Sequence, residues 1–421
     1  MARPSKDLRL ARLAYYYCRH AALGHSLPTQ EELANIMGVH RSQVSRWLKE
    51  AKEAGYIEET PPRLVLPRDL LEEVESQLLD AELHQQLMTE AFPREHCPHL
   101  KRLVVARTPA RAADEDARIP FLATHCVDEL MQSIGPSTKA IGWAWGMHCL
   151  EVARRLRTDL AYDGLECIPM LGTTAIGRGL DFAQHVRNRQ ASRICELAAA
   201  RLGGQAVPLP LPAFAPVHLV EDDELPAVIR FINGIDEARQ VFGEDYFVSQ
   251  GLEDVAELLP DWDPERAVAQ LARKGKLGVI SAVVTSVGSL GEKSPILQHD
   301  LLPDEQVRRL RESVALAGDL SEQVQVLQGQ QLSEETLTDL ARLRWRAIAV
   351  RIRDLIAMVA NGASIHVLAA RGNRAEAAFA AVHAGAVTHL YIDHLTAARI
   401  LEIAAACRRD FGYPPRRPTP G

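Results

Sequence analysis

The sequence predicts an α/β protein: an N-terminal three-helix, winged helix-turn-helix head followed by a large body with a mainly parallel sheet. Residues 29–57 predict the head, because their capping residues, glycines and apolar spacing are typical of two helices joined by a tight turn. Short apolar runs that alternate with amphipathic stretches predict the body, since this alternation is typical of repeated strand–helix units. We expect the head at residues 1–66, the body at 67–413 and a flexible tail at 414–421.

The head is expected to begin with a helix over residues 7–21. Its apolar side chains share one side of that helix: Leu10, Leu13, Ala14 and Tyr17. A short β-wing is expected to end the head, with one strand at Ile57, a turn at 61–62 and a second strand at 64–66.

The middle of the head carries the helix-turn-helix pattern itself. Thr29 and Glu32 have the spacing of a capping box and start one helix, and Gly38 can adopt the left-handed conformation that ends it. A second helix is expected over residues 41–54. Its buried stripe follows the i, i+4, i+7 spacing of an α-helix: Val44, Leu48 and Ala51.

Burial of this stripe leaves a polar face outside, which consists of Arg41, Ser42, Gln43, Ser45, Arg46 and Lys49. Arginine can bind guanine through two hydrogen bonds, glutamine can do the same with adenine, and serine and lysine reach phosphates. The second helix of such a motif reads the major groove of DNA. We therefore expect these six residues to bind DNA. An ordinary helical hairpin with a solvated polar face is the alternative.

Residues 69–89 are expected to form one helix after the head. Four apolar residues in it have alternating spacings of three and four: Leu71, Val74, Leu78 and Ala81. Such a helix could mediate self-association, but fewer than two clean heptads are more typical of a helix that faces a core.

Six apolar runs predict the strands of the body: 103–106, 140–145, 167–171, 279–287, 365–370 and 389–392. In open sheets of this kind, ligands bind beyond the carboxyl ends of the strands. Three segments do not follow this alternation. Residues 107–117 are expected to form a charged loop, and 221–270 and 291–345 are acidic, mostly helical insertions.

Charge is distributed unevenly. The chain of 421 residues has a net charge of −7, yet its first 56 residues carry nine Lys and Arg against five Asp and Glu. A basic head on an acidic body is more typical of a site-specific DNA-binding regulator than of a non-specific binder, which depends on bulk phosphate neutralisation.

The compartment follows from cysteine usage and hydropathy. The seven cysteines include no C-x-x-C pair and are typical of reduced thiols. The N-terminus lacks the apolar core of a secretory signal, and no apolar run is long enough to span a bilayer. We expect a cytoplasmic protein without a membrane partner.

Two turns that follow predicted strands are candidates for an anion site. Gly146 and His148 follow the run 140–145. A second turn follows the run 167–171 and includes Gly172, Thr173, Thr174 and Arg178. Glycines let backbone N–H groups approach an anion, threonine hydroxyls donate to it, and arginine adds charge. Ordinary strand-to-helix turns are the alternative, because neither segment matches a known phosphate-binding motif.

Catalytic and metal-binding patterns are sparse. His96, Cys97 and His99 lie close together, but no second pair of ligands completes a zinc motif. Neither G-x-S-x-G nor H-E-x-x-H occurs. We expect no metal, no cofactor and no enzymatic activity.

Three segments resemble the SorC family of bacterial transcriptional regulators, which is related to the DeoR type. They read VSRWLKEAKEAGYI, GWAWG and ARGNRAEAAFAAVHAGAVTHLYIDHLTAARIL. The resemblance is strongest at 30–58, 140–156 and 365–401. It implies a DNA-binding head and a sugar-binding body related in fold to sugar-phosphate isomerases, usually in a homotetramer that responds to a phosphorylated sugar.

The resemblance also implies which residues bind the effector. The family's Gly-Trp-Gly turn corresponds to Gly142, Trp145 and Gly146, and its second glycine loop to Gly172 and Thr173. A Gly-Asp pair corresponds to Gly318 and Asp319, and the last strand's turn to Asp393 with its neighbours. His148 and Arg374 stand where the family has threonine and lysine. Arginine binds an anion through a planar fork, unlike lysine, so these departures predict a different mode of anion binding.

A third departure lies at His40, where the family usually has a serine that caps the recognition helix. Histidine is a poorer cap, and its side chain can titrate near neutral pH. The start of this helix is therefore expected to be mildly pH-sensitive.

These observations predict a one-component transcriptional regulator that binds operator DNA, senses a small sugar or sugar phosphate, and self-associates as a dimer or tetramer. Two alternatives stay open. One is an enzyme of the sugar-phosphate isomerase or deaminase type with an appended DNA-binding head. The other is a DNA-binding protein that recruits partners and has no small-molecule ligand.

Overall fold

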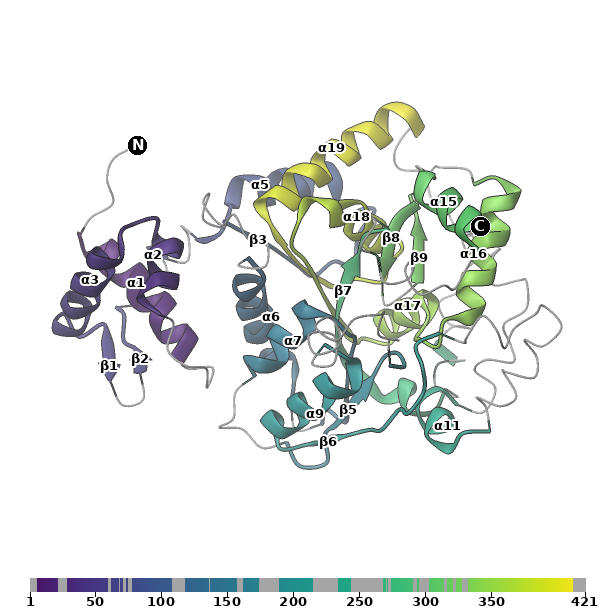
Figure 1. Cartoon of the computed structure of the whole chain (residues 1–421), viewed down its shortest axis with the longest axis horizontal. Coiled ribbons are helices and arrows are strands. Elements are labelled where there is room, and N and C mark those ends of the chain that lie inside the picture. Colours follow the sequence, from purple (N-terminus) through teal and green to yellow (C-terminus); the bar gives the residue numbers. More distant parts are fainter. Residues whose placement is uncertain are drawn as a thin grey trace.

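The computed structural model (Figure 1) describes most of the head and body. The described residues are 6–21, 29–59, 62–67, 69–70, 73–74, 78–107, 118–135, 137–156, 162–173, 189–214, 234–243, 268–269, 271, 274–290, 294, 303–313, 316–320, 323–327 and 332–411. Thr174 and Arg178, the tail at 414–421, and most of the segments at 107–117 and 221–270 lie outside them.

The head has the predicted three helices, and its wing has the predicted two strands, but the second strand lies at 62–64 instead of 64–66. Its elements are α1 (Lys6–Ala21), α2 (Gln30–Met37), α3 (Arg41–Glu53), β1 (Ile57–Glu59) and β2 (Pro62–Leu64). The two strands are antiparallel, with Ile57 opposite Leu64. Gly38 has a φ of 65° and ends α2, as its position predicts.

His40 caps α3 despite being an unfavourable residue for this position. Its backbone is extended, and its Nδ1 accepts a hydrogen bond from the Ser42 N–H at 3.4 Å. In return, the His40 N–H donates to Oε1 of Gln43 at 3.3 Å. The two bonds form a reciprocal capping box. Histidine is therefore a better N-cap of α3 than its residue type predicts.

The head has a hydrophobic core of its own. Leu13, Leu33, Val44 and Ala51 are completely buried and join its three helices. Val74 and Leu78, from the segment that follows the wing, belong to the same core. This segment therefore faces a core, which its short run of heptads favoured over self-association.

The single helix expected over 69–89 is wrong, because the chain leaves the helical conformation at Leu79. Leu79 forms an antiparallel bridge with Ala106, and the Asp80 N–H donates to the Val105 carbonyl oxygen at 2.8 Å. Asp80 then caps a new helix through Leu83. This helix is α5 (Ala81–Gln86), which continues as the π-helical turn η1 (Leu87–Ala91). At Leu79, pairing with the edge strand β3 (Arg102–Ala106) thus replaces helical hydrogen bonds.

The body contains the predicted parallel sheet. Its parallel strands are β3 (Arg102–Ala106), β4 (Ala140–Trp143), β5 (Glu166–Pro169), β6 (Gln205–Ala206), β7 (Ile280–Gly288), β10 (Ser364–Ala369) and β11 (His389–Asp393), in the order β3-β11-β10-β7-β4-β5-β6. All six predicted runs form strands of this sheet, and among its seven described parallel strands only the two-residue β6 was not expected. The α/β class is therefore confirmed.

Helices cover both faces of the sheet (Figure 1). The first face carries α6 (Ile119–Ser133), α7 (Met147–Arg154) and α9 (Ala191–Leu202), and the second carries α17 (Ile352–Ala360), α18 (Ala375–His383) and α19 (His394–Phe411). Shorter helices are α11 (Asp236–Phe242), η4 (Gly275–Val279) and η5 (Gly372–Arg374). Among the described helices, none is both long and apolar enough to cross a membrane.

The segment 291–345 is only partly helical. It contains the expected helices α15 (Asp304–Glu312) and α16 (Glu334–Arg346), but also a hairpin of β8 (Leu316–Leu320) and β9 (Gln323–Val326). β8 pairs antiparallel with the end of β7, and the hairpin packs on α18. Gly318 has a φ of 138°, and a Cβ there would lie 2.3 Å from the Gly288 carbonyl oxygen. Long-range pairing, rather than local periodicity, therefore determines these strands.

Three buried side chains meet across β10 and β11. The rings of His366 and His389 stack at 4.3 Å, and His366 Nδ1 lies 3.0 Å from the Tyr391 hydroxyl. Burial, and then the neighbouring His389, hold the pKa of His366 well below its usual value. Burial, followed by Lys101 and Arg102, lowers the pKa of His389 to about 4. Both rings are therefore neutral at pH 7.

We predict that acidification destabilises the protein through these histidines. Their pKa values are lower in the folded than in the unfolded chain, so unfolding takes up protons below pH about 6.5, and stability decreases as the pH falls. Each such histidine contributes a slope of about 1.4 kcal/mol per pH unit until its folded pKa is reached. His366→Phe should make urea-unfolding free energies measured between pH 7 and 5 less steep by about this amount.

Ile365→Val is the matched control for this experiment, because Ile365 is equally buried on the same strand. It should lower stability at every pH and keep the wild-type slope. Equal slopes for His366→Phe and wild type would contradict the prediction.

Candidate functional site

The carboxyl ends of β4, β7 and β10 lie side by side in the sheet, and the chain leaves β4 and β7 toward opposite faces. After β4 it enters α7 on the first face, and after β7 it leads to the hairpin on the second face. Such a point of divergence leaves a crevice in which open α/β sheets bind ligands. Gly146 starts α7 here with a φ of 112°, and a Cβ on it would lie 3.6 Å from Ser286 Oγ at the end of β7.

His148 lies in the first turn of α7 and is 1% exposed. Its Nδ1 is 2.9 Å from Nη1 of Arg374, and its Nε2 is 3.2 Å from the backbone N–H of Ala370. Two of the predicted effector residues, from distant parts of the chain, are thus in direct contact.

Burial, and then the charges of Arg374 and Arg371, hold the pKa of His148 well below its usual value. A neutral imidazole has one N–H and one acceptor nitrogen. Both Arg374 and the Ala370 amide are donors, and they meet opposite nitrogens of the ring. The ring can accept a hydrogen bond from only one of them at a time.

Arg371 places the turn that carries Arg374. Among the described residues it is the one amino acid other than glycine with a positive φ, at 92°. A backbone in this region costs on the order of 1–3 kcal/mol and is concentrated at functional sites. Arg371 was not predicted as a site residue, although R-G-N-R follows the predicted strand 365–370 directly.

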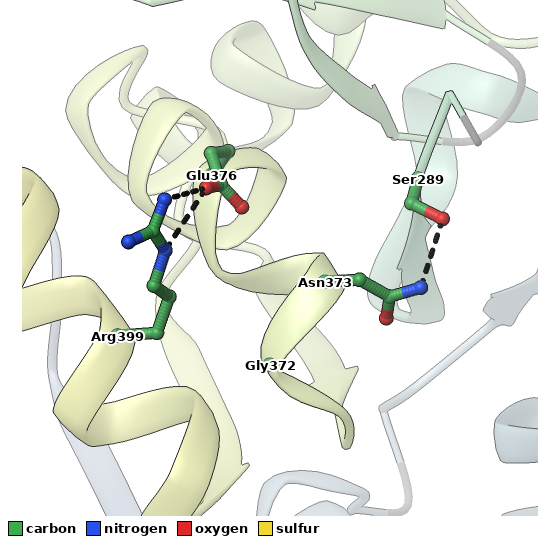
Figure 2. A pocket seen from close by; sticks show the side chains of 5 residues that line it. All are labelled: Ser289, Gly372, Asn373, Glu376 and Arg399. Carbon is green, nitrogen blue, oxygen red and sulfur yellow. Dashed lines mark hydrogen bonds and ion pairs between the residues drawn. The ribbon is translucent and has the colours of Figure 1, made fainter.

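An open cleft of about 480 Å³ adjoins this turn (Figure 2). Its lining residues follow β7 directly or come from η5, from the first turn of α18 and from the second turn of α19: Ser289, Gly372, Asn373, Glu376 and Arg399. This volume lies within the range of small-molecule sites. None of the five was predicted. Gly372 and Asn373 follow the predicted strand 365–370 closely and could have been found, whereas Glu376 and Arg399 come together only through the fold.

The cleft is lined by paired polar groups. Asn373 Nδ2 donates to Ser289 Oγ at 3.3 Å, and Arg399 donates through Nη2 and Nε to Glu376 Oε1 at 3.0 and 3.2 Å (Figure 2). Asn373 precedes Arg374 in η5. One short turn therefore joins the open cleft to the buried His148–Arg374 contact.

Gly172 and Thr173 pack against a different part of the chain, the backbone of Leu211 and Pro212. A Cβ on Gly172 would lie 2.2 Å from the Pro212 carbonyl oxygen, so close backbone packing requires glycine there. The Thr173 N–H donates to the Leu211 carbonyl oxygen at 2.6 Å. Thr174 and Arg178, predicted for the same turn, lie outside the described residues.

The two predicted aspartates are both buried. Asp319 pairs with Gly288, and a Cβ on Gly288 would lie 2.1 Å from its Oδ2, so this carboxylate lies beside the end of β7. Asp393 Oδ2 accepts from Arg118 Nη1 at 3.0 Å, and its Oδ1 accepts from the Thr396 N–H at 2.8 Å. Both carboxylate oxygens of Asp393 are thus engaged within the protein.

In the head, α3 has the predicted orientation. Val44 and Ala51 are buried, Gln43 is half-buried, and five of the predicted DNA-binding residues are exposed: Arg41, Ser42, Ser45, Arg46 and Lys49. Arg46 and Lys49 form only loose ion pairs, each at 3.8 Å, with Glu50 and Glu53. The polar face of α3 is therefore available to a partner.

The histidines and cysteine at 96–99 have structural contacts. Cys97 Sγ lies 3.6 Å from Nδ1 of His383, and His99 Nε2 lies 2.7 Å from the Val382 carbonyl oxygen. Within the described ranges, no three His, Cys, Asp or Glu side chains are grouped as metal ligands would be.

Sequence comparison assigns the head. Residues 16–57 match the family model of a helix-turn-helix domain. A search of curated proteins finds no match.

Structure comparison identifies proteins with similar structures. A domain described as sugar-binding, from a transcriptional repressor of Vibrio fischeri, aligns with a TM-score of 0.52 and 15% identity over 77% of this chain and 100% of that chain. A transcriptional regulator from Streptococcus pneumoniae aligns with a TM-score of 0.51 and 14% identity over 76% and 98%. The full-length sorbitol operon regulator SorC from Klebsiella pneumoniae aligns with a TM-score of 0.49 and 16% identity over 94% and 100%.

The Vibrio fischeri and Streptococcus pneumoniae structures share the fold of the body. The fold that the resemblance implied for the body is therefore confirmed. The predicted architecture, a helix-turn-helix head before an α/β body with a mainly parallel sheet, is confirmed as well.

We predict that Gly172→Ala destabilises the protein by about 1–3 kcal/mol, since the new methyl group overlaps a backbone carbonyl that cannot move freely. Gly135→Ala is the matched control, because nothing lies within 4 Å of a Cβ at Gly135. Urea unfolding monitored by circular dichroism measures both. Equal stability of the two variants would show that the contact with Pro212 does not constrain this turn.

Proposed function

We propose that this protein is a transcriptional regulator, not an enzyme, whose head reads operator DNA under control of a small anionic sugar bound at the edge of the sheet. The observation that carries this proposal is that one chain joins an exposed, polar recognition helix to a cleft that adjoins a buried His–Arg contact. The sugar-binding description of the Vibrio fischeri domain supports the ligand class. Self-association as a dimer or tetramer belongs to the same proposal.

In the head, we assign base reading to Arg41, Ser42, Gln43 and Arg46. Ser45 and Lys49, on the same face, would contact the DNA backbone. Gln43 has one restriction, because its Oε1 accepts the His40 N–H in the capping box. Its amide nitrogen can still donate to a base, whereas two-bond recognition of adenine requires this cap bond to break.

In the body, the anion would bind at Arg374. A neutral His148 accepts from either Arg374 or the Ala370 N–H, and the backbone amide is fixed while the arginine side chain can turn. An anionic oxygen that accepts from Arg374 leaves Nε2 of His148 to the Ala370 amide. Nδ1 of His148 then carries the proton and can donate to the same ligand. The site thereby offers an anion two donors without a charged histidine.

The neighbouring cleft would bind the rest of the ligand. Asn373, Ser289, Glu376 and Arg399 supply both donors and acceptors, which hydroxyl groups of a sugar require. Gly146 would let the ligand approach the start of α7, whose N-terminal end favours negative charge. Asp319 lies beside this cleft and is a further candidate. Gly172, Thr173 and Asp393 are not assigned to the ligand, since their contacts with the rest of the chain are structural.

Enzymatic turnover is not part of this proposal. The buried His148 is held neutral by its surroundings, and Glu376 is paired with Arg399. Neither arrangement resembles an acid/base pair that a substrate can reach. Sustained product formation from sugar phosphates would contradict the proposal.

We predict that Arg374→Gln weakens ligand binding at least tenfold. A melting-temperature screen with glucose 6-phosphate, fructose 6-phosphate, ribose 5-phosphate, 6-phosphogluconate and the unphosphorylated parents identifies the ligand. At a hundredfold excess over Kd, the ligand stabilises the wild type by about 2.7 kcal/mol. Arg308→Gln is the control, because this exposed arginine pairs with Glu305 and Glu312 of its own helix, α15, and does not line the cleft. An equal shift in both variants would exclude Arg374 from the site.

A second prediction concerns α3. DNA sites selected from random sequence by the full-length protein provide the operator. Arg46→Ala should cost about 1–3 kcal/mol at one base pair and relax the sequence preference there, while Lys49→Ala should weaken binding to all sequences alike. Fluorescence anisotropy on selected and random DNA measures both effects. Equal losses on the two DNAs for both variants would contradict the assignment.

A further inference from the structure

The head contacts the body at the first turn of α6. The ring of Tyr16 on α1 meets the ring of Phe121 on α6 edge to face, with centroids 5.3 Å apart and planes at 89°. Phe121 packs against the hydrophobic core of the head, although it belongs to the body. Such an aromatic pair contributes about 0.5–1.5 kcal/mol beyond the burial of its area.

The connecting segment reinforces this junction. The Arg107 N–H donates to the Leu78 carbonyl oxygen at 2.7 Å, and Leu78 belongs to the core of the head. Leu78, Tyr15 and Tyr16 surround a small cavity together with Phe121 and Thr124 of α6. The head thus packs against α6 and against the end of β3.

The same turn of α6 is linked by an ion pair to the carboxyl end of β11, on the side of the sheet where the proposed ligand site lies. Arg118, directly before α6, donates through Nη1 to Asp393 Oδ2 at 3.0 Å, and the two side chains are 11% and 0% exposed. Asp393 is the last residue of β11, and its other oxygen accepts from the Thr396 N–H at the start of α19. One buried carboxylate therefore fixes the starts of two helices.

These two helices lead to different places. α19 carries Arg399, which lines the open cleft and pairs with Glu376 (Figure 2). α6 carries Phe121, three residues after Arg118 and so on the same helical turn. Arg118 and Asp393 do not line the cavity at the junction. Arg118 is linked to the head through α6, whereas the backbone of Asp393 also pairs with Ala106 of β3.

We propose that Arg118 and Asp393 are positioning residues that fix the first turn of α6 and thereby hold the DNA-binding head against the body. A displacement of α19 at the cleft would move Asp393 and, through it, Arg118. The first turn of α6 would then carry the movement to Phe121, which contacts Tyr16 of the head. The resemblance suggested Asp393 as an effector ligand, whereas its contacts give it this connecting role. Only the use of the link as a signal depends on the proposed function; the link itself does not.

Hydrogen exchange of the full-length protein, without DNA or ligand, tests this link. Phe121→Ala should speed amide exchange in α1 about tenfold by undocking Tyr16. Arg118→Gln and Asp393→Asn should have the same effect on α1, although neither residue lines the junction. Asparagine keeps an oxygen for the Thr396 N–H, so α19 still starts normally. Peptides from β7 and β10 should exchange as in the wild type and confirm that the body is folded.

Two further variants separate positioning from general stability. Arg118→Lys keeps the positive charge and should restore most of the wild-type protection of α1. Lys274→Gln breaks another buried ion pair of the body, which Lys274 forms with Asp354; the two side chains are 13% and 3% exposed. This variant should leave the amide exchange of α1 unchanged. The proposal is overturned if Arg118→Gln and Asp393→Asn leave α1 protected, if Arg118→Lys exchanges as fast as Arg118→Gln, or if Lys274→Gln accelerates α1 equally. Because no ligand is used, these outcomes are independent of the thermal screen that tests the proposed function.

Discussion

Parallel strands have their carboxyl ends at one edge of a sheet, and each connection must return along a face to the opposite edge. In this protein, that constraint brings His148 after β4, Ser289 after β7 and Arg374 after β10 to neighbouring positions. The site exists because strands distant in the sequence share this edge. Burial of the strands under helices on both faces keeps the edge fixed, and the loops remain free to vary.

The electrostatics of the site follow from burial. Removing His148 from water favours the neutral ring, and two nearby arginines favour it further. A neutral ring between two donors can accept a hydrogen bond from only one of them at a time. In the proposed function, a ligand oxygen accepts from Arg374, and the ring then accepts from the Ala370 N–H. The arginine at position 374 suits this role because its charge persists at any physiological pH.

Local sequence patterns predicted what local forces determine. The six apolar runs became strands, and Val44 and Ala51 placed the polar face of α3 outward, because burial of apolar side chains decides both. The hairpin of β8 and β9 and the break at Leu79 were missed, since each depends on pairing with a distant strand. Likewise, His148 follows a predicted strand and Arg374 was found through the resemblance, whereas Glu376 and Arg399 meet only after α18 and α19 pack together.

In the proposed function, the body binds a ligand and the head responds to it, which requires a physical connection, and the buried Arg118–Asp393 pair lies between them. The expected coupling is a change in DNA binding by the head when ligand binds at the carboxyl ends of the strands. Its direct measurement is the Kd of the full-length protein for a selected DNA site, with and without the sugar phosphate that most raises the melting temperature. A change of about fivefold or more at saturating ligand is predicted. The same Kd with and without bound ligand would contradict it.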